Sequence, residues 1–290
     1  MGFSKVSSVL VVQAIITLSI VDAQLTKADV HDIKGLLADM MREDVETNAE
    51  FNLIGGCLRL MFHDCVGGEI DGCIQLTNPS NKGNPAVTAI VKDKLKYQFG
   101  RKDTTGTCPS RTFPDFTLNP TGYLRKKKNF ANLTHSQAVA LLGCHSTGRA
   151  HVESSGYRHS WVVDNTALTN DYYQLLSNTS LDWHVAYVTH DGVTKVQWEL
   201  NTGTKTIMLL HQDASLWYKI KLGNGGVPTC GYPGSPSSSD FPRLPECAPS
   251  AEREFVKAFR DDLLLWIREL CDGIMIMTTV AESNLIDPFD

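Results

Sequence analysis

The sequence lacks the excess of basic residues that a nucleic-acid-binding protein usually carries. Its 27 Lys and Arg residues are outnumbered by 32 Asp and Glu residues, which gives a formal net charge of −5. It contains no internal repeat and no HExxH motif of the kind found in zinc hydrolases. Beyond the first residues, no stretch is long and apolar enough to cross a bilayer. We therefore expect no nucleic-acid partner, and a composition of 42% hydrophobic residues suits one large globular domain or two small ones.

The first residues have the pattern of a secretory signal peptide. Lys5 precedes an apolar run over residues 6–21, and Ala23 supplies a small residue at its end. A membrane anchor is the alternative, although the run is short for a span and contains Ser and Gln. We expect residues 1–23 to be removed and residues 24–290 to form a secreted protein with no membrane segment.

Two further features agree with export. The chain has eight cysteines, an even number that would tend to pair in an oxidising compartment. Cys230 and Cys247 are a candidate pair within a Gly/Pro/Ser-rich loop over residues 223–250. Asn132 and Asn178 each begin an N-x-S/T sequon, so N-glycosylation is expected as well.

Hydrophobic periodicity predicts a mainly α fold with a small β part. Thr134 and Gln137 have the spacing of a capping box at the start of one helix, and Gly273 is the expected stop of the last helix. Residues 183–209 alternate apolar and polar side chains, which is typical of a β-hairpin. The predicted helices cover residues 28–45, 51–65 (apolar nearly all round), 87–95, 134–148, 170–176 and 251–271, and the predicted loops cover 77–82, 99–122 and 223–250.

The most informative stretch runs from Arg59 to Cys65, with the sequence Arg-Leu-Met-Phe-His-Asp-Cys. Arg59 and His63 are four residues apart, so on a helix they share one face. Cleavage of a peroxide needs a base that moves a proton between the two oxygens and a fixed cation near the leaving oxygen. An Arg–His pair can supply both functions. The alternative is a pair that merely satisfies its own hydrogen bonds in a core.

A second stretch, from Ala138 to Gly148, is an apolar helix that ends in a single histidine, His145. A rigid helix that carries an imidazole into a dry site suits an axial iron ligand. A histidine at the end of a helix is otherwise a partner of the helix dipole. Cys144 is excluded as the ligand because adjacent helical residues point in different directions.

Taken together, these stretches resemble the haem peroxidases of the plant–fungal–bacterial superfamily. The word Arg-x-x-Phe-His-Asp-Cys is similar to the distal helix of the secreted members. The segment after His145 is similar to the proximal region of cytochrome c peroxidase and ascorbate peroxidase. The resemblance implies a haem peroxidase fold, mainly α with a small β insert. It places haem b between a distal half, about residues 24–130, and a proximal half, about residues 131–290.

On the distal side, the resemblance implies that Arg59 and His63 act on hydrogen peroxide and that Asn81 orients His63. Asp64 and Asp71 match oxygen ligands of the calcium ion that secreted members hold there. Cys73 stands where the family usually has Ser. A disulfide between Cys65 and Cys73 is therefore an alternative to calcium.

On the proximal side, the resemblance places His145 on the haem iron, with its neighbour Ser146 also at the cofactor. Asp213 matches the carboxylate that accepts a hydrogen bond from the ligand histidine and increases its electron donation to the iron. Trp161 matches a tryptophan that is bonded to that carboxylate and can carry a radical. The alternatives are an exposed loop aspartate and a tryptophan that only fills space.

Two positions depart from the ascorbate enzymes. Thr169 replaces an Asp that binds a cation, and the loss of a nearby cation favours a positive charge on Trp161. Ser154 replaces an Arg that binds the ascorbate anion, which makes ascorbate a poor fit as donor. The expected donor is a small phenol, another one-electron reductant or a redox protein.

The segment over residues 92–99 is shorter than in the family, which normally has another helix and a loop beside the distal pocket. The resemblance is therefore compatible with two alternative functions. One is a haem peroxidase that reduces hydrogen peroxide and oxidises a one-electron donor. The other is a secreted haem-binding or matrix protein whose activity is impaired or lost because of the short segment.

Overall fold

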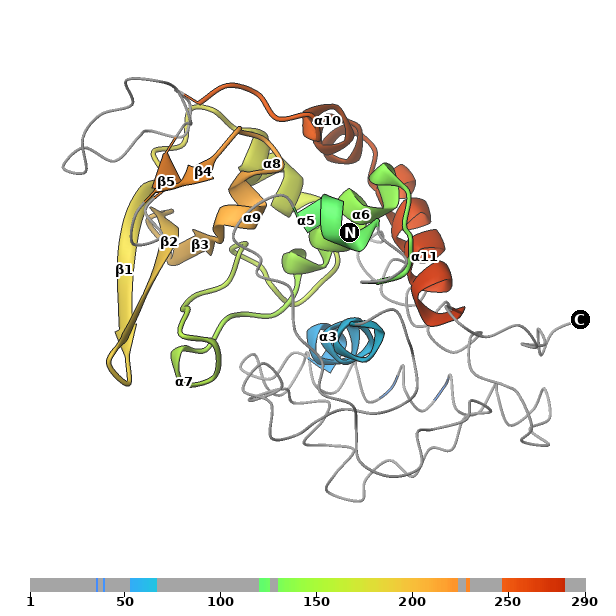
Figure 1. Cartoon of the computed structure of the whole chain (residues 1–290), viewed down its shortest axis with the longest axis horizontal. Helices are drawn as coiled ribbons and strands as arrows, with labels where there is room; N and C mark the ends of the chain where they lie inside the picture. The colour runs from blue at the N-terminus through green and yellow to red at the C-terminus, as the bar shows by residue number, and fades with distance from the viewer. Residues whose placement is uncertain are drawn as a thin grey trace, which may run out of the picture.

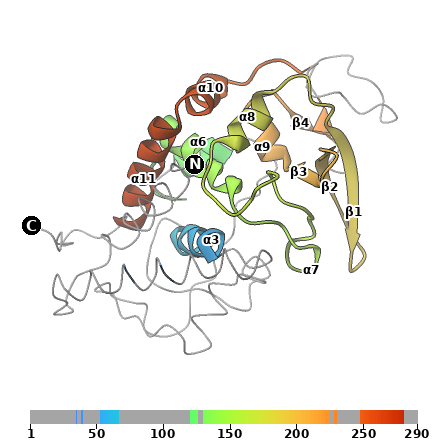
Figure 2. The same cartoon turned by 180° about the vertical axis from the view of Figure 1, so that it is seen from behind.

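The protein is mainly helical, with a three-stranded sheet at one edge (Figure 1). The computed structural model describes residues 35, 39, 53–66, 120–125, 130–223, 228–229 and 247–279. The view from behind shows the sheet and helix α11 (Leu263–Thr279) on opposite sides of α6 (His135–Leu142) and α8 (Asp171–Ser177) (Figure 2). The predicted fold class, mainly α with a small β part, is confirmed.

Helix α6 begins at the predicted capping box. Thr134 Oγ1 accepts a hydrogen bond from the backbone N–H of Gln137 (3.2 Å), and Gln137 Oε1 accepts one from the backbone N–H of Thr134 (3.0 Å). The α-helix ends at Leu142, earlier than the sequence predicted. A short 3-10 helix, η2 (Gly143–Ser146), continues the chain in the same direction.

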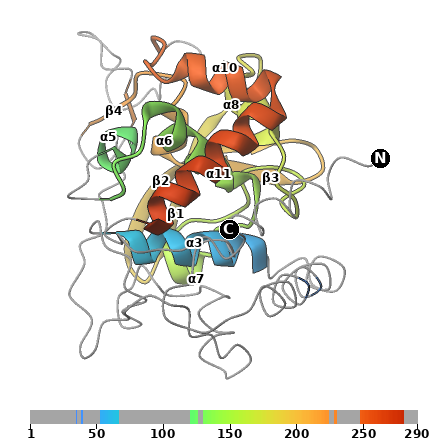
Figure 3. The ribbon, with the colours of Figure 1, turned by 90° about the vertical axis from the view of Figure 1, so that its right-hand side faces the viewer.

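The C-terminal helix differs from the prediction in two ways. It is two helices, α10 (Arg253–Asp261) and α11, separated at Asp262, whose backbone is extended. It also continues past Gly273 to Thr279. Gly273 lies inside α11, where a Cβ would make an ordinary contact, 3.4 Å from the Cβ of Gln137 on α6. Helices α6 and α11 pack against each other, and Figure 3 shows them side by side.

The predicted hairpin is present and has one strand more than expected. Strand β1 (His184–His190) pairs with β2 (Val193–Asn201), and β2 pairs with β3 (Thr206–Leu209), all antiparallel. Two short strands, β4 (Lys221–Leu222) and β5 (Pro228–Thr229), form a second antiparallel pair. The sheet is buried mainly through the inner part of β2 and through β3.

Helix α3 (Leu53–Cys65) coincides closely with the predicted buried helix, but it is buried on one face rather than all round. Ile54, Leu58 and Cys65 belong to the main core. Arg59 and His63 are half-buried. Helix α5 (Pro120–Leu124) begins inside the segment predicted as loop; proline is tolerated at the first position of a helix because its missing N–H has no partner there.

One apolar core joins α3, α6, α8, α10 and α11 and the inner strands. Its largest fully buried side chains are aromatic: Trp198, Trp217, Trp266, Tyr172, Tyr173, Phe130 and Phe259. The remaining short helices are α7 (Val152–Ser155) and α9 (His211–Ala214). Among the described helices, none has the length and apolar character needed to cross a membrane.

Several predictions fall outside the described residues. The helix over residues 28–45 is described only at Gly35 and Asp39, and both are helical. The expected signal peptide, the loop over 77–82, the helix over 87–95 and the short segment over 92–99 lie outside the described ranges.

Candidate functional site

The centre of the candidate site is His145, in the 3-10 helix that follows α6. Its Nδ1 lies 2.7 Å from Oδ1 of Asp213. A carboxylate can only accept hydrogen bonds, so Nδ1 carries a hydrogen, and in the neutral imidazole Nε2 then has the free lone pair. The side chain of His145 is 26% exposed, whereas that of Asp213 is fully buried. Nε2 is therefore the atom of this pair that can bind a ligand.

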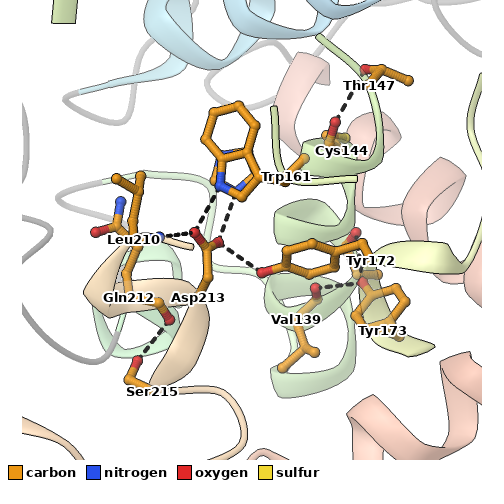
Figure 4. A network of polar contacts seen from close by, with 12 residues as sticks. Val139, Cys144, Thr147, Trp161, Tyr172, Tyr173, Leu210, Gln212, Asp213 and Ser215 are labelled. Carbon is orange, nitrogen blue, oxygen red and sulfur yellow. Dashed lines mark hydrogen bonds and ion pairs between the residues drawn. The ribbon is translucent and has the colours of Figure 1, made fainter. Parts of the chain in front are cut away.

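Asp213 is the polar hub of the site (Figure 4). Its carboxylate accepts four hydrogen bonds: from His145 Nδ1 (2.7 Å), Tyr172 Oη (2.7 Å), Trp161 Nε1 (2.8 Å) and the backbone N–H of Leu210 (2.7 Å). The last bond caps the N-terminus of α9 and fixes the carboxylate relative to the backbone. Four donors fill the acceptor positions of a carboxylate, so its orientation is fully determined.

The electrostatics of Asp213 favour a buried negative charge. Burial alone raises the pKa of a carboxyl group. The charge of His145 and the hydrogen bonds from His145, Tyr172 and Leu210 outweigh that effect and leave the pKa of Asp213 below its usual 3.8. The carboxylate therefore remains ionised and strengthens the electron donation of the imidazole to anything bound at Nε2.

Trp161 lies against the same histidine. Its ring is stacked on His145, with centroids 4.0 Å apart and planes inclined by 13°. The β insert holds this part of the chain, because Ser160 bridges to β3 and its carbonyl accepts a hydrogen bond from Met208 (2.9 Å). The sheet thus helps to position the Trp161 side chain in the candidate site. The alternative that Trp161 only fills space does not account for its bond to a buried carboxylate.

Tyr172 was not among the residues that the sequence singled out. It lies on α8, is 1% exposed, and donates to the same oxygen of Asp213 as His145 does. Burial, followed by the charge of Asp213 and the hydrogen bond to it, raises the pKa of Tyr172 well above its usual value, so it is a neutral donor. A tyrosine on a helix that packs against the core is ordinarily expected only to fill space there. Nothing in the sequence around Tyr172 indicated its hydrogen bond to Asp213.

The predicted distal pair lies on α3, which contacts both η2 and α11. Arg59 and His63 are half-buried on the helix face away from Leu58 and Cys65. Burial lowers the pKa of Arg59 from its usual value, as expected for a guanidinium in a partly dry environment. Phe62 packs against Phe130, with ring centroids 4.9 Å apart, and so joins α3 to the segment that precedes α6.

Other predicted site residues are described only in part. Asp64 lies near the C-terminal end of α3, whereas Asn81 and Asp71 lie outside the described residues. Among the described residues, no group of three or more His, Cys, Asp or Glu side chains could hold a metal ion. The calcium site therefore remains a prediction without support.

The residues around His145 fit a haem group. They offer one unoccupied imidazole nitrogen with a carboxylate behind it, which is the donor set of an axial iron ligand. Ser146, also predicted at the cofactor, is fully buried, and its hydroxyl has no hydrogen-bond partner within the described part of the chain. An orphaned buried hydroxyl beside His145 is compatible with a polar group of a bound cofactor.

The cysteines do not all pair as expected. Cys144 and Cys271 carry thiols. Cys65 also carries a thiol, which donates to the carbonyl of Met277 (3.5 Å), so the alternative of a disulfide with Cys73 is wrong. Cys247 is disulfide-bonded, and its predicted partner Cys230 lies outside the described residues.

Comparisons with known proteins agree with this geometry. A family model described as "Peroxidase" matches residues 83–220. Cytochrome c peroxidase of Pyricularia oryzae is 31% identical over 133 residues, which are 45% of this chain and 34% of the relative. That of Yarrowia lipolytica is 30% identical over 136 residues, which are 46% of this chain and 38% of the relative. A heme-binding peroxidase of Aspergillus fumigatus is 28% identical over 140 residues, which are 46% of this chain and 42% of the relative. The matched part of the chain thus spans less than half the length of these relatives.

The comparisons overturn the predicted compartment. The matching cytochrome c peroxidases are named as mitochondrial proteins, whereas residues 1–23 predict secretion. The prediction of a secreted protein is therefore wrong. A basic residue followed by a short apolar run is a degenerate pattern that does not determine a compartment by itself. N-glycosylation at Asn132 and Asn178 was expected because the protein was expected to be secreted, so that expectation no longer has support.

The comparisons show that the part of the chain that carries the candidate site is similar in sequence to known peroxidases. The family match includes His145, Trp161, Tyr172 and Asp213. The structure brings these four side chains together around one carboxylate. Over residues 83–220 the chain is similar to the peroxidase family, and the relatives that it matches include cytochrome c peroxidases.

Proposed function

We propose that this protein is a haem peroxidase that reduces hydrogen peroxide with electrons from a redox protein, a c-type cytochrome. The observation that carries the proposal is the joint arrangement of His145, Asp213 and Trp161. One carboxylate holds the imidazole through Oδ1 and the indole through Oδ2, and the two rings are stacked. Burial of a carboxylate has a desolvation cost, and the packing of an apolar core does not require it.

In this proposal haem b lies between the distal half, residues 24–130, and the proximal half, residues 131–290. His145 would hold the iron through Nε2, and the Ser146 hydroxyl would meet a polar group of the cofactor. Bound haem supplies the redox chemistry that no side chain of the protein can supply. Asp213 keeps the imidazole in one tautomer and orientation, which a ligand histidine requires.

On the distal side, His63 would take a proton from one peroxide oxygen and return it to the other. Arg59, four residues earlier on the same helix, would stabilise the negative charge that develops on the leaving oxygen. The partial burial of Arg59 supports this role, because a fixed cation acts more strongly in a drier environment. Asn81, in the resemblance, would orient His63.

Trp161 would pass electrons from the donor to the site. Its N–H donates to the ionised carboxylate of Asp213, and a negative charge at 2.8 Å favours a positive charge on the indole. The relatives named cytochrome c peroxidase suggest a c-type cytochrome as the donor, and with it a mitochondrial location. Ser154, which replaces the arginine of the ascorbate enzymes, argues against ascorbate.

The test is rapid mixing of the full chain, reconstituted with haem, with stoichiometric hydrogen peroxide. We expect a fast change in haem absorption that is slowed at least ~100-fold in His63→Leu, because a general base contributes that much. His184→Leu, an exposed histidine on β1, is the matched control and should react as the wild type does. His145→Ala should abolish the native haem spectrum, and added imidazole should restore it in part.

Two outcomes would contradict the proposal. Haem bound through His145 without a reaction with peroxide would favour the alternative of a haem-binding protein that has lost turnover. The short segment over residues 92–99 motivates that alternative. If haem binding is unchanged in His145→Ala, then His145 is not the iron ligand, and both the peroxidase and the haem-binding alternative are contradicted.

A further inference from the structure

One oxygen of Asp213 has two donors. Oδ1 lies 2.7 Å from His145 Nδ1 and also 2.7 Å from the hydroxyl of Tyr172. The other oxygen is occupied by Trp161 and by the backbone of Leu210. With every acceptor position filled and no exposed surface on the carboxylate, water cannot replace any of these donors. The two hydrogen bonds on Oδ1 therefore compete for the same electron density.

We propose that Tyr172 is a positioning residue that weakens the hydrogen bond from His145 to Asp213 and so limits the electron density that His145 gives to the haem iron. This inference rests on the proposed binding of haem at His145. A hydroxyl that donates to a carboxylate withdraws charge from it, and a less basic carboxylate draws the Nδ1 hydrogen less strongly. The imidazole then has less anionic character at Nε2.

The structure holds the phenol of Tyr172 in place. Its ring meets the ring of His145 edge to face, with centroids 6.0 Å apart and planes at 78°, and meets Tyr173 in the same manner at 5.1 Å and 75°. Helix α8 is fixed at its start by Asn170, whose side chain donates to the carbonyl of Arg260 (2.7 Å). The hydroxyl is therefore delivered to Oδ1 by packing and cannot turn away.

Tyr173 provides a matched control on the next position of the helix. It is also fully buried, but its hydroxyl donates to backbone carbonyls of α6, at 2.9 Å from Val139 and 3.3 Å from Ala140 (Figure 4). A substitution there removes a buried tyrosine hydroxyl without changing any hydrogen bond of Asp213. Comparison of the two variants separates an effect on the carboxylate from a general effect on packing.

The test is the ferric/ferrous reduction potential of the haem-reconstituted full chain, together with the iron–histidine stretching frequency by resonance Raman spectroscopy. In Tyr172→Phe we expect the potential to shift to a more negative value and the stretching frequency to rise, because His145 becomes a stronger donor. In Tyr173→Phe both should stay at the wild-type values. In the Asp213→Asn background, Tyr172→Phe should no longer shift the potential.

Replacement of Tyr172 by a fluorotyrosine tests the same idea with a side chain that keeps its hydroxyl and nearly its volume. Fluorination makes the phenol a stronger donor, so the potential should shift in the positive direction. Equal shifts in Tyr172→Phe and Tyr173→Phe, or no shift in either, would overturn the proposal. So would a fluorotyrosine shift of the opposite sign. These measurements need bound haem but no turnover, so a protein that binds haem and fails to reduce peroxide would still decide the role of Tyr172.

Discussion

Trp266 on α11 donates a hydrogen bond from its indole to the backbone carbonyl of Ala140 on α6, at 3.0 Å and across 126 residues of chain. Ala140 lies in the last turn of α6, immediately before the 3-10 helix that carries His145. The same carbonyl also accepts hydrogen bonds from the backbone N–H of Gly143 and from the hydroxyl of Tyr173 on α8 (3.3 Å), so the end of α6 is tied to both α8 and α11. The C-terminal helix therefore supports the backbone on which the proposed iron ligand lies.

Gly143→Ala tests that support. A Cβ at position 143 would meet the Tyr173 hydroxyl and would lie 2.6 Å from Trp266 Nε1, and both rings are fully buried. We expect the free energy of unfolding to fall by about 1–3 kcal/mol, as for overpacked cores, and haem affinity to fall with it. Thermal unfolding monitored by circular dichroism measures the first effect. Gly35→Ala, where no atom of the described residues lies within 4 Å of the added Cβ, is the control, and an equal loss there would contradict the explanation.

Asp213→Ala should destabilise the protein even without cofactor. The substitution leaves the donors of His145, Trp161 and Tyr172 buried without an acceptor, at a cost of ~1–3 kcal/mol for each neutral group. We expect a loss of at least about 3 kcal/mol in the free energy of unfolding measured with urea. Asp272→Ala, an exposed position on α11, should change stability by less than ~0.5 kcal/mol. Similar losses in both variants would sink the idea that Asp213 organises the site.

Thr134→Ala removes one half of the capping box at the start of α6. The expected loss is about 1 kcal/mol in the free energy of unfolding, because the backbone N–H of Gln137 loses its acceptor. Thr134→Ser keeps the hydroxyl and should retain most of the stability. If serine is as unfavourable as alanine, the cap is not the cause.

The Cys144 thiol should resist alkylation. Burial, and secondarily the neighbouring Cys271, raise the pKa of Cys144 from 9.0 to about 12. Three pKa units correspond to ~1,000-fold less thiolate at pH 8 than in the unfolded chain, and the thiolate is the reactive form. The rates at which iodoacetamide labels Cys144 in the native protein and in the urea-unfolded protein measure this ratio.

The raised pKa of Cys144 also predicts how the stability of the protein depends on pH. The unfolded chain loses this proton first, so the contribution of Cys144 is complete below about pH 9 and declines as the pH rises toward 12. Rapid labelling of Cys144 in the native protein at pH 8 would contradict the raised pKa of its thiol.

Trp161→Phe should separate the reaction with peroxide from oxidation of the donor. Phenylalanine can still stack on His145 but has no N–H for Asp213. We expect steady-state oxidation of a reduced c-type cytochrome to fall by about tenfold or more, a barrier change of ~1.4 kcal/mol, while the first reaction with peroxide is retained. Trp217→Phe is the control, because Trp217 is buried but its indole nitrogen has no hydrogen-bond partner among the described residues. Full cytochrome oxidation by Trp161→Phe would exclude Trp161 from the electron path.

Features that depend on neighbours along the chain were predictable. The capping box of Thr134 and Gln137 is a local hydrogen-bond pattern, and the four-residue spacing of Arg59 and His63 gives a common helix face whatever surrounds the helix. The hairpin over residues 183–209 follows from alternating side chains. The prediction of Gly273 as a stop is wrong because a glycine has the same appearance in the sequence whether it ends a helix or lies inside one.

The sequence by itself determined most of the long helical segments, the β-hairpin, the residues that could bind haem iron and the family resemblance, since each depends on residue type and short spacing. Only the tertiary structure decided which side chains share the carboxylate of Asp213. Its partners His145, Trp161 and Tyr172 lie 68, 52 and 41 residues away in the chain. Hydrogen bonds at 2.7–2.8 Å between such distant residues depend on how η2, α8, α9 and the sheet pack, and the one-dimensional pattern does not contain that packing.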